Sequence, residues 1–210
     1  MRRSRSTTLA ILALATVGLG LAVIAIRNSG YFLVVDNRQK SDAIVITQGD
    51  SLDAVYWMGR RLLADGYGRE LLLDARTDRI YFGRSQAEWA DDFIRKTSVD
   101  VAGQVKVCPI QVDTTAEEVY DVGNCLKGRS IQSVLLVVDD FHCRRSLIIF
   151  SRLLPQYHWS IAAVPDVARF RTPWWQRRVW IRTALMEWQH MLWWELVDQW
   201  RFTPVAGAQH

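Results

Sequence analysis

The feature that most constrains the fold is a strand-like run that leads directly into a helix. Residues Val134 to Val138 are branched and apolar, and the run is too short for a helix and apolar on both faces. Such a pattern is typical of a central strand in a parallel sheet that helices cover on both sides. From His142 onward apolar side chains recur at helical spacing, and Pro155 ends the run. The stretch therefore predicts a strand, a polar turn and a helix.

The turn between them, Asp139 to Arg145, carries two carboxylates, one imidazole and two guanidinium groups. In an open parallel sheet such turns line the crevice where ligands bind, and the free N–H groups at the helix start favour anions. Imidazole titrates near pH 7, so His142 is a candidate general acid or base; the alternative is that it only hydrogen-bonds across two loops. Arg145 is the candidate anion clamp, because its planar fork matches phosphate or carboxylate, whereas Arg144 is expected in solvent.

The rest of the chain alternates between apolar runs and helical patterns. The expected strands are 42–47, 70–74, 104–112, 134–138 and 159–164, and the expected helices are 52–64, 85–96, 113–126, 142–154 and 174–200. Five alternations predict an α/β fold, doubly wound around a mostly parallel, Rossmann-like sheet of about five strands. Pro109 places the third strand near an edge or at a bulge. The turns after strands one, three and four are expected to form a common crevice.

The last predicted helix, 174–200, holds seven of the ten tryptophans. An apolar stripe at three-to-four spacing is expected to dock it on the sheet, namely Ile181, Leu185, Trp188, Leu192 and Leu196. Other tryptophans of this helix lie beside Arg177, Arg178 and Arg182, a combination that is typical of a membrane interface. Core packing or a dimer contact is favoured over a membrane interface for these tryptophans.

The segment Leu9 to Ile26 is apolar and uncharged over eighteen residues, and Arg2, Arg3 and Arg5 precede it. At about 1.5 Å per residue it spans roughly 27 Å, which is close to the thickness of the hydrocarbon core and longer than the apolar region of a cleaved signal peptide. We therefore expect an uncleaved transmembrane anchor, with cleavage after Ala25 as the alternative.

The arginines before the anchor outnumber those just after it, so the N-terminus is expected to stay in the cytoplasm. The predicted organisation is a basic cytoplasmic tail of residues 1–8, an anchor of residues 9–26, a linker of residues 27–40 and an exported domain of residues 41–203. The protein is then a single-pass protein of the inner (plasma) membrane whose domain faces the periplasm or the cell exterior.

Composition excludes several classes of function. Outside the anchor and its flanking arginines the chain has as many basic as acidic residues, 22 of each, and a neutral domain without a basic stripe is a poor candidate for binding nucleic acid. No G-x-S-x-G elbow, Walker loop or G-x-G-x-x-G motif occurs. Asp50, Asp139 and Asp140 have no spacing that demands a metal ion, so no metal site is predicted.

The three cysteines, Cys108, Cys125 and Cys143, lack C-x-x-C spacing, so a zinc site is not expected. Buried free thiols are favoured over a bond between Cys108 and Cys125, although a strand and the helix that follows it can lie face to face in an oxidising compartment.

Several short motifs follow one another as they do in a known family. The turn Asp140 to Ser146, with the strand before it, is similar to a strand followed by Thr-Ser-x-Tyr-His-x-x-Arg-Ala. The segment Ser41 to Gly49 is similar to Ala-Asp-Ala-Ile-Val-Val-Leu-Gly-Gly, with Gln48 in place of one glycine. Thr115, Glu117 and Glu118 match Asn-Thr-x-Glu-Asn/Glu, and Glu187 matches the glutamate of a Glu-x-x-Lys helix. The chain thus resembles the YdcF/SanA/ElyC-like family of bacterial envelope proteins.

The resemblance implies ligand contacts from Gly49, Asp50, Thr115, Glu118, Asp140, Arg145 and Glu187. It also makes Glu117 a second candidate catalytic residue beside His142, whereas a helix-capping box alone explains the segment around Glu117 equally well. Resemblance to YdcF further implies S-adenosylmethionine binding, but no loop here indicates an adenosine site, and no cofactor is predicted.

Three hypotheses of function follow. The first is an anchored, exported protein that binds an anionic, phosphate-bearing metabolite such as a lipid-linked cell-wall precursor, and resemblance to SanA and ElyC implies this role in envelope or peptidoglycan maintenance. The second is an enzyme that processes a phosphate ester with His142 as acid or base and Arg145 stabilising charge. The third is a non-catalytic scaffold whose tryptophan-rich helix binds a membrane partner.

Overall fold

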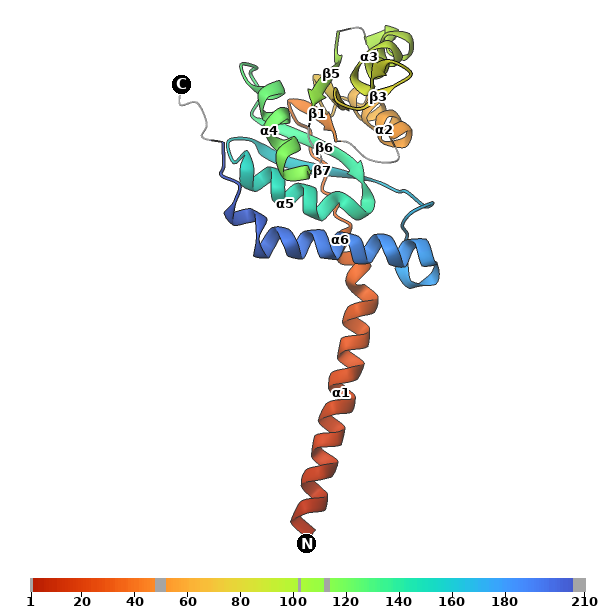
Figure 1. Cartoon of the computed structure of the whole chain (residues 1–210), viewed down its shortest axis with the longest axis vertical. Coiled ribbons are helices and arrows are strands. Elements are labelled where there is room, and N and C mark those ends of the chain that lie inside the picture. Colours follow the sequence, from red (N-terminus) through yellow and green to blue (C-terminus); the bar gives the residue numbers. More distant parts are fainter. Residues whose placement is uncertain (1, 48–51, 102, 112–113, 206–210) are drawn as a thin grey trace.

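An α/β domain stands on the end of one long helix, α1 (Arg2–Leu33), in the computed structural model, which describes residues 2–47, 52–101, 103–111 and 114–205 (Figure 1). The strands are β1 (Ala43–Ile46), β2 (Glu70–Arg76), β3 (Ile80–Tyr81), β4 (Arg84–Ser85), β5 (Val105–Ile110), β6 (Ser133–Asp139) and β7 (His158–Val164). The domain helices are α2 (Leu52–Ala64), α3 (Gln86–Thr97), α4 (Thr115–Leu126), α5 (Cys143–Leu153) and α6 (Arg178–Leu196). Short 3₁₀ turns occur at η1 (Val99–Val101), η2 (Asp140–His142), η3 (Trp174–Gln176) and η4 (Asp198–Trp200).

The central sheet is parallel throughout and has the strand order β5-β2-β1-β6-β7. Along the chain these are its third, second, first, fourth and fifth strands, so the winding direction reverses between β1 and β6. This is the order of a doubly wound, Rossmann-like sheet, and ligands bind such sheets beyond the carboxyl ends of the strands near the reversal. The fold class predicted from the sequence is confirmed. Pro109 lies in β5, an edge strand, as predicted.

Helices cover both faces of the sheet. On one face α4 and α5 bury Val119 and Phe150 against strand residues such as Leu136. On the other face α2 and α3 bury Tyr56 and Ile94 against the alternate strand side chains. Because both faces are covered, the central strands are apolar at consecutive positions, which is why their positions are evident from the sequence.

The helix α1 is longer than the predicted anchor. Its segment Thr7–Leu33 is long and apolar enough to cross a membrane. The helix continues to Leu33, so the first part of the predicted linker, residues 27–40, is helical. The reason is tertiary packing: Leu33 is buried in the domain, and the ring of Phe32 stacks on Trp188 of α6 at 5.3 Å between centroids.

Two further contacts hold the C-terminal end of α1 against the domain. Arg144, which was expected in solvent, donates from Nε to the backbone carbonyl of Phe32. Its guanidinium also lies 3.8 Å from the centre of the Phe32 ring. A Cβ atom at Gly30 would lie 2.4 Å from Cδ1 of Trp174, whereas Gly20 in the apolar segment has nothing within 4 Å. Glycine is therefore required at position 30 by the close approach of the tryptophan, and the end of α1 is a fitted part of the domain.

The last helix is shorter and rotated relative to the prediction. The stretch 174–200 is divided into η3, α6 and η4. Of the five residues that were expected to dock this helix, Ile181 and Trp188 are partly buried against a core cluster. The other three, Leu185, Leu192 and Leu196, are 58%, 53% and 73% exposed. The buried residues of α6 are instead Trp180, Ala184, Glu187, Met191 and Trp194. Both sets recur at helical spacing, so periodicity alone could not choose between them, and the polar partners of Glu187 described below decide the rotation.

A small antiparallel hairpin of β3 and β4 lies between β2 and α3, where no strand was expected from the sequence. At its tip Phe82 is 99% exposed and has φ of 51°, which is unusual for a residue with a Cβ atom. The hairpin lies beside α3, and Ser85 at its end caps α3, as its side chain accepts from the N–H of Glu88.

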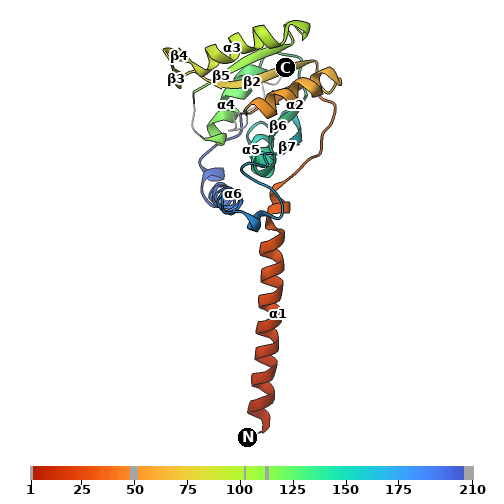
Figure 2. The ribbon, with the colours of Figure 1, turned by 90° about the vertical axis from the view of Figure 1, so that its right-hand side faces the viewer.

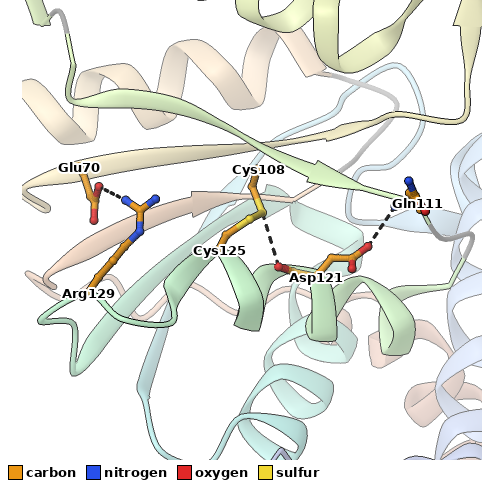
Figure 3. Close-up of a disulfide and its surroundings, with 6 residues drawn as sticks. All are labelled: Glu70, Cys108, Gln111, Asp121, Cys125 and Arg129. Carbon is orange, nitrogen blue, oxygen red and sulfur yellow. Dashed lines mark hydrogen bonds and ion pairs between the residues drawn. A yellow bond between two sulfur atoms is a disulfide. The ribbon is translucent and has the colours of Figure 1, made fainter.

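Cys108 and Cys125 form a disulfide, contrary to the preference for free thiols (Figure 3). β5 and α4 are consecutive and pack against each other, which places the two Cα atoms 5.9 Å apart, within the range that a disulfide requires. Cys143 is a buried free thiol. Sequence spacing could not show how β5 and α4 face one another, and this is why the bond was the less favoured alternative.

Replacing both Cys108 and Cys125 by alanine should lower the free energy of unfolding by about 3 kcal/mol, because the bond closes a loop of 17 residues in the unfolded chain. Denaturant titration in detergent with and without a thiol reductant measures this. The reductant should destabilise the wild type and leave the double variant unchanged. Equal stability of the wild type under both conditions would show that the bond contributes nothing.

Candidate functional site

A cavity of about 630 Å³ lies at the carboxyl edge of the sheet, on the side where α6 passes. Its wall combines the ends of β2, β5 and β6 with the starts of α4 and α5 and one side of α6. The principal polar residues that line it are Arg76, Arg79, Thr115, Glu118, Asp139, His142, Arg145, Arg169, Arg182, Glu187 and His190. The location agrees with the rule that doubly wound sheets bind ligands beyond the carboxyl ends of their strands.

At the centre of the wall a buried carboxylate, Glu187, pairs with two groups from the turn after β6. Its Oε1 lies 3.0 Å from Nδ1 of His142, and its Oε2 accepts from Nε of Arg145 at 3.0 Å. Arg145 also donates from Nη1 to Oγ1 of Thr115 at 2.9 Å. Four elements, η2, α5, α4 and α6, are thereby joined by one network that faces the cavity.

The hydrogen bonds determine the tautomer of His142. Arg145 can only donate, and its Nη2 lies 2.9 Å from Nδ1 and 3.0 Å from Nε2 of the imidazole. We assign the proton of the neutral ring to Nδ1, which donates to Glu187, and Nε2 accepts from Arg145. This arrangement satisfies both ring nitrogens and orients the imidazole as a carboxylate orients a catalytic base.

Burial raises the pKa of Glu187, but the positive charge that His142 carries when it is protonated, the hydrogen bonds of His142 and His190 and the charge of Arg145 outweigh it and lower the pKa far below the ordinary value. Glu187 is therefore ionised throughout the physiological range. Its negative charge holds Arg145 in place in the wall.

The cavity carries more positive than negative groups. Within the described part of the chain, five arginines and three acidic residues line it. Arg76 is almost completely buried at the end of β2, where Nη2 pairs with Asp78 at 2.5 Å, and Arg182 is exposed on α6. The lining therefore has an excess of positive groups, although Arg145, Arg76 and Arg169 each pair with a carboxylate.

Two acidic residues, Asp74 and Glu118, lie close together behind the cavity wall. Asp74 of β2 is completely buried, and burial together with the negative charge of Glu118 raises the pKa of Asp74 well above its ordinary value. The raised pKa favours the protonated form of Asp74, in which the pair carries less negative charge than two carboxylates would. Glu118 itself lines the cavity, so this pair lies at the carboxyl edge of the sheet.

The structure brings together most of the predicted site residues that it describes. His142, Arg145, Thr115, Glu118 and Glu187 all line the same cavity. This cluster draws on the turns after the third and fourth strands of the sheet and on a distant helix, so these two turns share one cavity. The turn after the first strand, which was expected to join them, lies largely outside the described residues.

Two predicted residues lie apart from this cluster. Glu117 is outside the cavity lining, and its Oε2 accepts from Oγ1 of Thr114, the residue whose side chain caps α4. Asp140 is also outside the lining, and its Oδ1 accepts from the N–H of Phe141. Gly49 and Asp50 lie outside the described residues.

Sequence reasoning missed Arg76, Arg79 and Arg182. Arg76 is the last residue of β2 and Arg79 lies just after it, and neither was given a role from the sequence. Their position after a parallel strand was the available signal, because all such turns lie at one edge of the sheet. Arg182 was assigned to a membrane-like surface, and no signal placed it near the turn of His142.

The described residues contain no group of three or more histidines, cysteines, aspartates or glutamates that could hold a metal ion. In comparisons with known proteins, no family profile matches the chain and no curated protein sequence matches it. The site must therefore be interpreted from its own geometry.

The pKa of Asp140 predicts a measurable dependence of stability on pH. Burial raises this pKa from 3.8 to about 6. Between these values the folded state binds a proton that the unfolded state has lost, so this group's contribution to stability is complete below pH 4 and is lost as the pH rises through 6. After a discount for partial exposure of the carboxyl group, the loss is about 1 to 2 kcal/mol.

Replacing Asp140 by asparagine, which keeps the acceptor for Phe141, should remove this loss. The measurement is the free energy of unfolding of both proteins in detergent from pH 4 to pH 7, and the difference between the two profiles isolates Asp140. Asp53→Asn, at an exposed position on α2, is the control. A constant difference between Asp140→Asn and the wild type over this range would contradict the raised pKa.

Proposed function

We propose that this protein is a membrane-anchored envelope protein of the YdcF/SanA/ElyC-like type. Its cavity binds an anionic, phosphate-bearing metabolite, and the protein takes part in the maintenance of cell-envelope or peptidoglycan precursors. The observation that carries this proposal is the arginine-rich cavity at the carboxyl edge of the sheet, with Arg145 held toward it by Glu187 and Thr115.

The charge balance favours phosphate over a simple carboxylate. Two more arginines than acidic residues line the cavity within the described part of the chain, and a phosphate monoester carries between one and two negative charges at neutral pH. Arg145 donates from Nε to Glu187 and from Nη1 to Thr115. Its Nη2 lies 3.3 Å from Oε1 of Glu187 and 3.0 Å from Nε2 of His142, so a ligand oxygen at Nη2 would compete with these two groups. A phosphate oxygen that accepts from Nη2 would free Nε2 of His142 to contact the same ligand.

Export of the domain is supported by two independent features. The arginines at the start of α1, before its apolar segment, favour a cytoplasmic N-terminus. The disulfide between Cys108 and Cys125 requires an oxidising compartment to persist, which the periplasm or the cell exterior provides and the cytoplasm does not.

A second candidate function is hydrolysis of a phosphate ester, favoured by the pairing of His142 with Glu187. In this reaction Nε2 of His142 would accept a proton from water while the water oxygen bonds to phosphorus. The bond from phosphorus to the ester oxygen would break, and the leaving oxygen would take the proton back from the imidazolium. Arg145 would stabilise the charge that develops on the phosphoryl oxygens.

Arg145→Gln should weaken the binding of inorganic pyrophosphate tenfold or more, since a charge-assisted hydrogen bond contributes about 1.5 to 3 kcal/mol. Arg182→Gln should weaken it less, and because Arg182 is exposed the fold is kept. The measurement is isothermal titration of the full-length protein in detergent at low salt. Arg61→Gln, at a side chain 78% exposed on α2, is the control for a general loss of positive charge. Equal affinities in all four proteins would refute an anion site in this cavity.

For the hydrolase, His142→Gln should lower the rate of phosphate release from an alkyl phosphate about 10²- to 10⁴-fold, because glutamine keeps a hydrogen bond to Glu187 but cannot take up the proton. His158→Gln, at the exposed start of β7, should leave the rate unchanged. Pyrophosphate binding measured on the same samples separates the two functions: a wild type that binds but releases no phosphate is a binding protein only.

A further inference from the structure

The outward side of α6 is an apolar surface. Leu185, Leu192, Trp193 and Leu196 are 53% to 73% exposed, and Trp200 of η4 is 75% exposed. We call these five residues the outward face. The four on α6 lie on the side of the helix that faces away from its buried residues, where exposed Arg178, Arg182 and Gln189 are interspersed with them. An apolar patch of this kind on an ordered helix marks an interaction surface.

The outward face lies at the end of the helix that can cross a membrane. α6 runs across the end of α1, at the base of the domain (Figures 1 and 2). The contact is close, since Phe32 stacks on Trp188, and Leu33 shares a buried cluster with Met191. The domain lies on one side of α6, and α1 extends away on the opposite side (Figure 2).

The length of α1 sets the depth at which α6 would lie. Its apolar segment, Thr7–Leu33, has 27 residues. A hydrocarbon core of about 30 Å accommodates roughly 20 residues of helix, so about seven residues, or roughly 10 Å, extend into the headgroup layer. Gly30, Phe32 and Leu33, the residues that pack against the domain, belong to this excess. The helix that packs on them is held at headgroup depth.

We propose that α6 is an interfacial helix whose outward face lies in the headgroup layer of the same bilayer that α1 crosses. Leucine and tryptophan suit the boundary between acyl chains and headgroups, because the indole ring has an apolar body and one polar N–H. Arginines flank the surface: Arg27 lies over the ring of Trp175 at 4.9 Å, and Arg152 lies 6.0 Å from the ring centre of Trp200. Such cations attract anionic lipid headgroups.

The bilayer is favoured over a protein partner because α1 brings it to this face without any further association. An interfacial helix also gives α6 two defined surroundings, the domain on one side and lipid on the other. The same helix supplies Arg182, Glu187 and His190 to the cavity wall. The domain would then be held in one orientation on the membrane, with the cavity beside the membrane surface.

Tryptophan fluorescence quenching in nanodiscs tests this proposal on the full chain. The lipid is a phosphatidylcholine and phosphatidylglycerol mixture brominated near the start of the acyl chains, which quenches only tryptophans that lie at that depth. Replacing Trp193 and Trp200 by phenylalanine should reduce the quenched share of emission by roughly half, because these are the two most exposed tryptophans near α1. Phenylalanine keeps the ring, so the fold is retained.

Trp57 and Trp89 provide the matched control, as they are 50% and 43% exposed on α2 and α3, at the end of the domain remote from α1 (Figure 1). Replacing both by phenylalanine should not reduce lipid quenching, and it should reduce quenching by iodide in the aqueous phase. If the Trp193 and Trp200 variant keeps the lipid quenching of the wild type and loses iodide quenching, the outward face is in water or against a protein, and the proposal is wrong. The proposal is also wrong if the wild-type protein does not enter nanodiscs, because α1 would then not cross the bilayer.

Discussion

A buried carboxylate on the last helix, Glu187, determines how the chain closes. The residue is almost inaccessible to solvent and would be costly to bury alone, but His142 and Arg145 from the turn after β6 compensate its charge. Loss of one partner of a buried ion pair typically costs about 3 to 5 kcal/mol. This requirement fixes the rotation of α6, whose apolar residues by themselves would allow two different faces toward the sheet. The cavity wall and the outward face both follow from that rotation.

A second constraint acts on the other side of the same helix. Trp188 stacks on Phe32, and Trp174 fills the space that the absence of a side chain at Gly30 leaves. α6 is therefore held between the carboxyl edge of the sheet and the end of α1. α6 supplies Glu187 to the cavity wall and also packs against the end of α1. A ligand that moves Arg145 or Glu187 would therefore act on the helix that connects the cavity to α1.

The sequence best predicted those elements whose environment follows from the residues next to them in the chain. The strands covered on both faces are continuous apolar runs, and the side chains at their carboxyl ends, such as His142 and Arg145, lie at the binding edge by topology. Glu187 was expected only through the family resemblance, since nothing in its neighbourhood indicates a contact with a turn more than forty residues away. The disulfide was not favoured from the sequence for a similar reason, because it depends on which residues of β5 and α4 face one another.

The rotation of α6 was mispredicted for a different reason. Helical periodicity identifies an apolar face by contrast with a polar face toward water, and α6 offers apolar residues on two sides. When one side is the domain and the other is lipid, the usual rule that the apolar stripe is the core stripe fails. The deciding residue is then the polar one: Glu187 lies among buried Trp180, Ala184 and Met191, and only the side with cationic partners can accommodate it. In a domain that packs directly on its own anchor, the buried charge therefore shows which face is the core and leaves the other to the membrane.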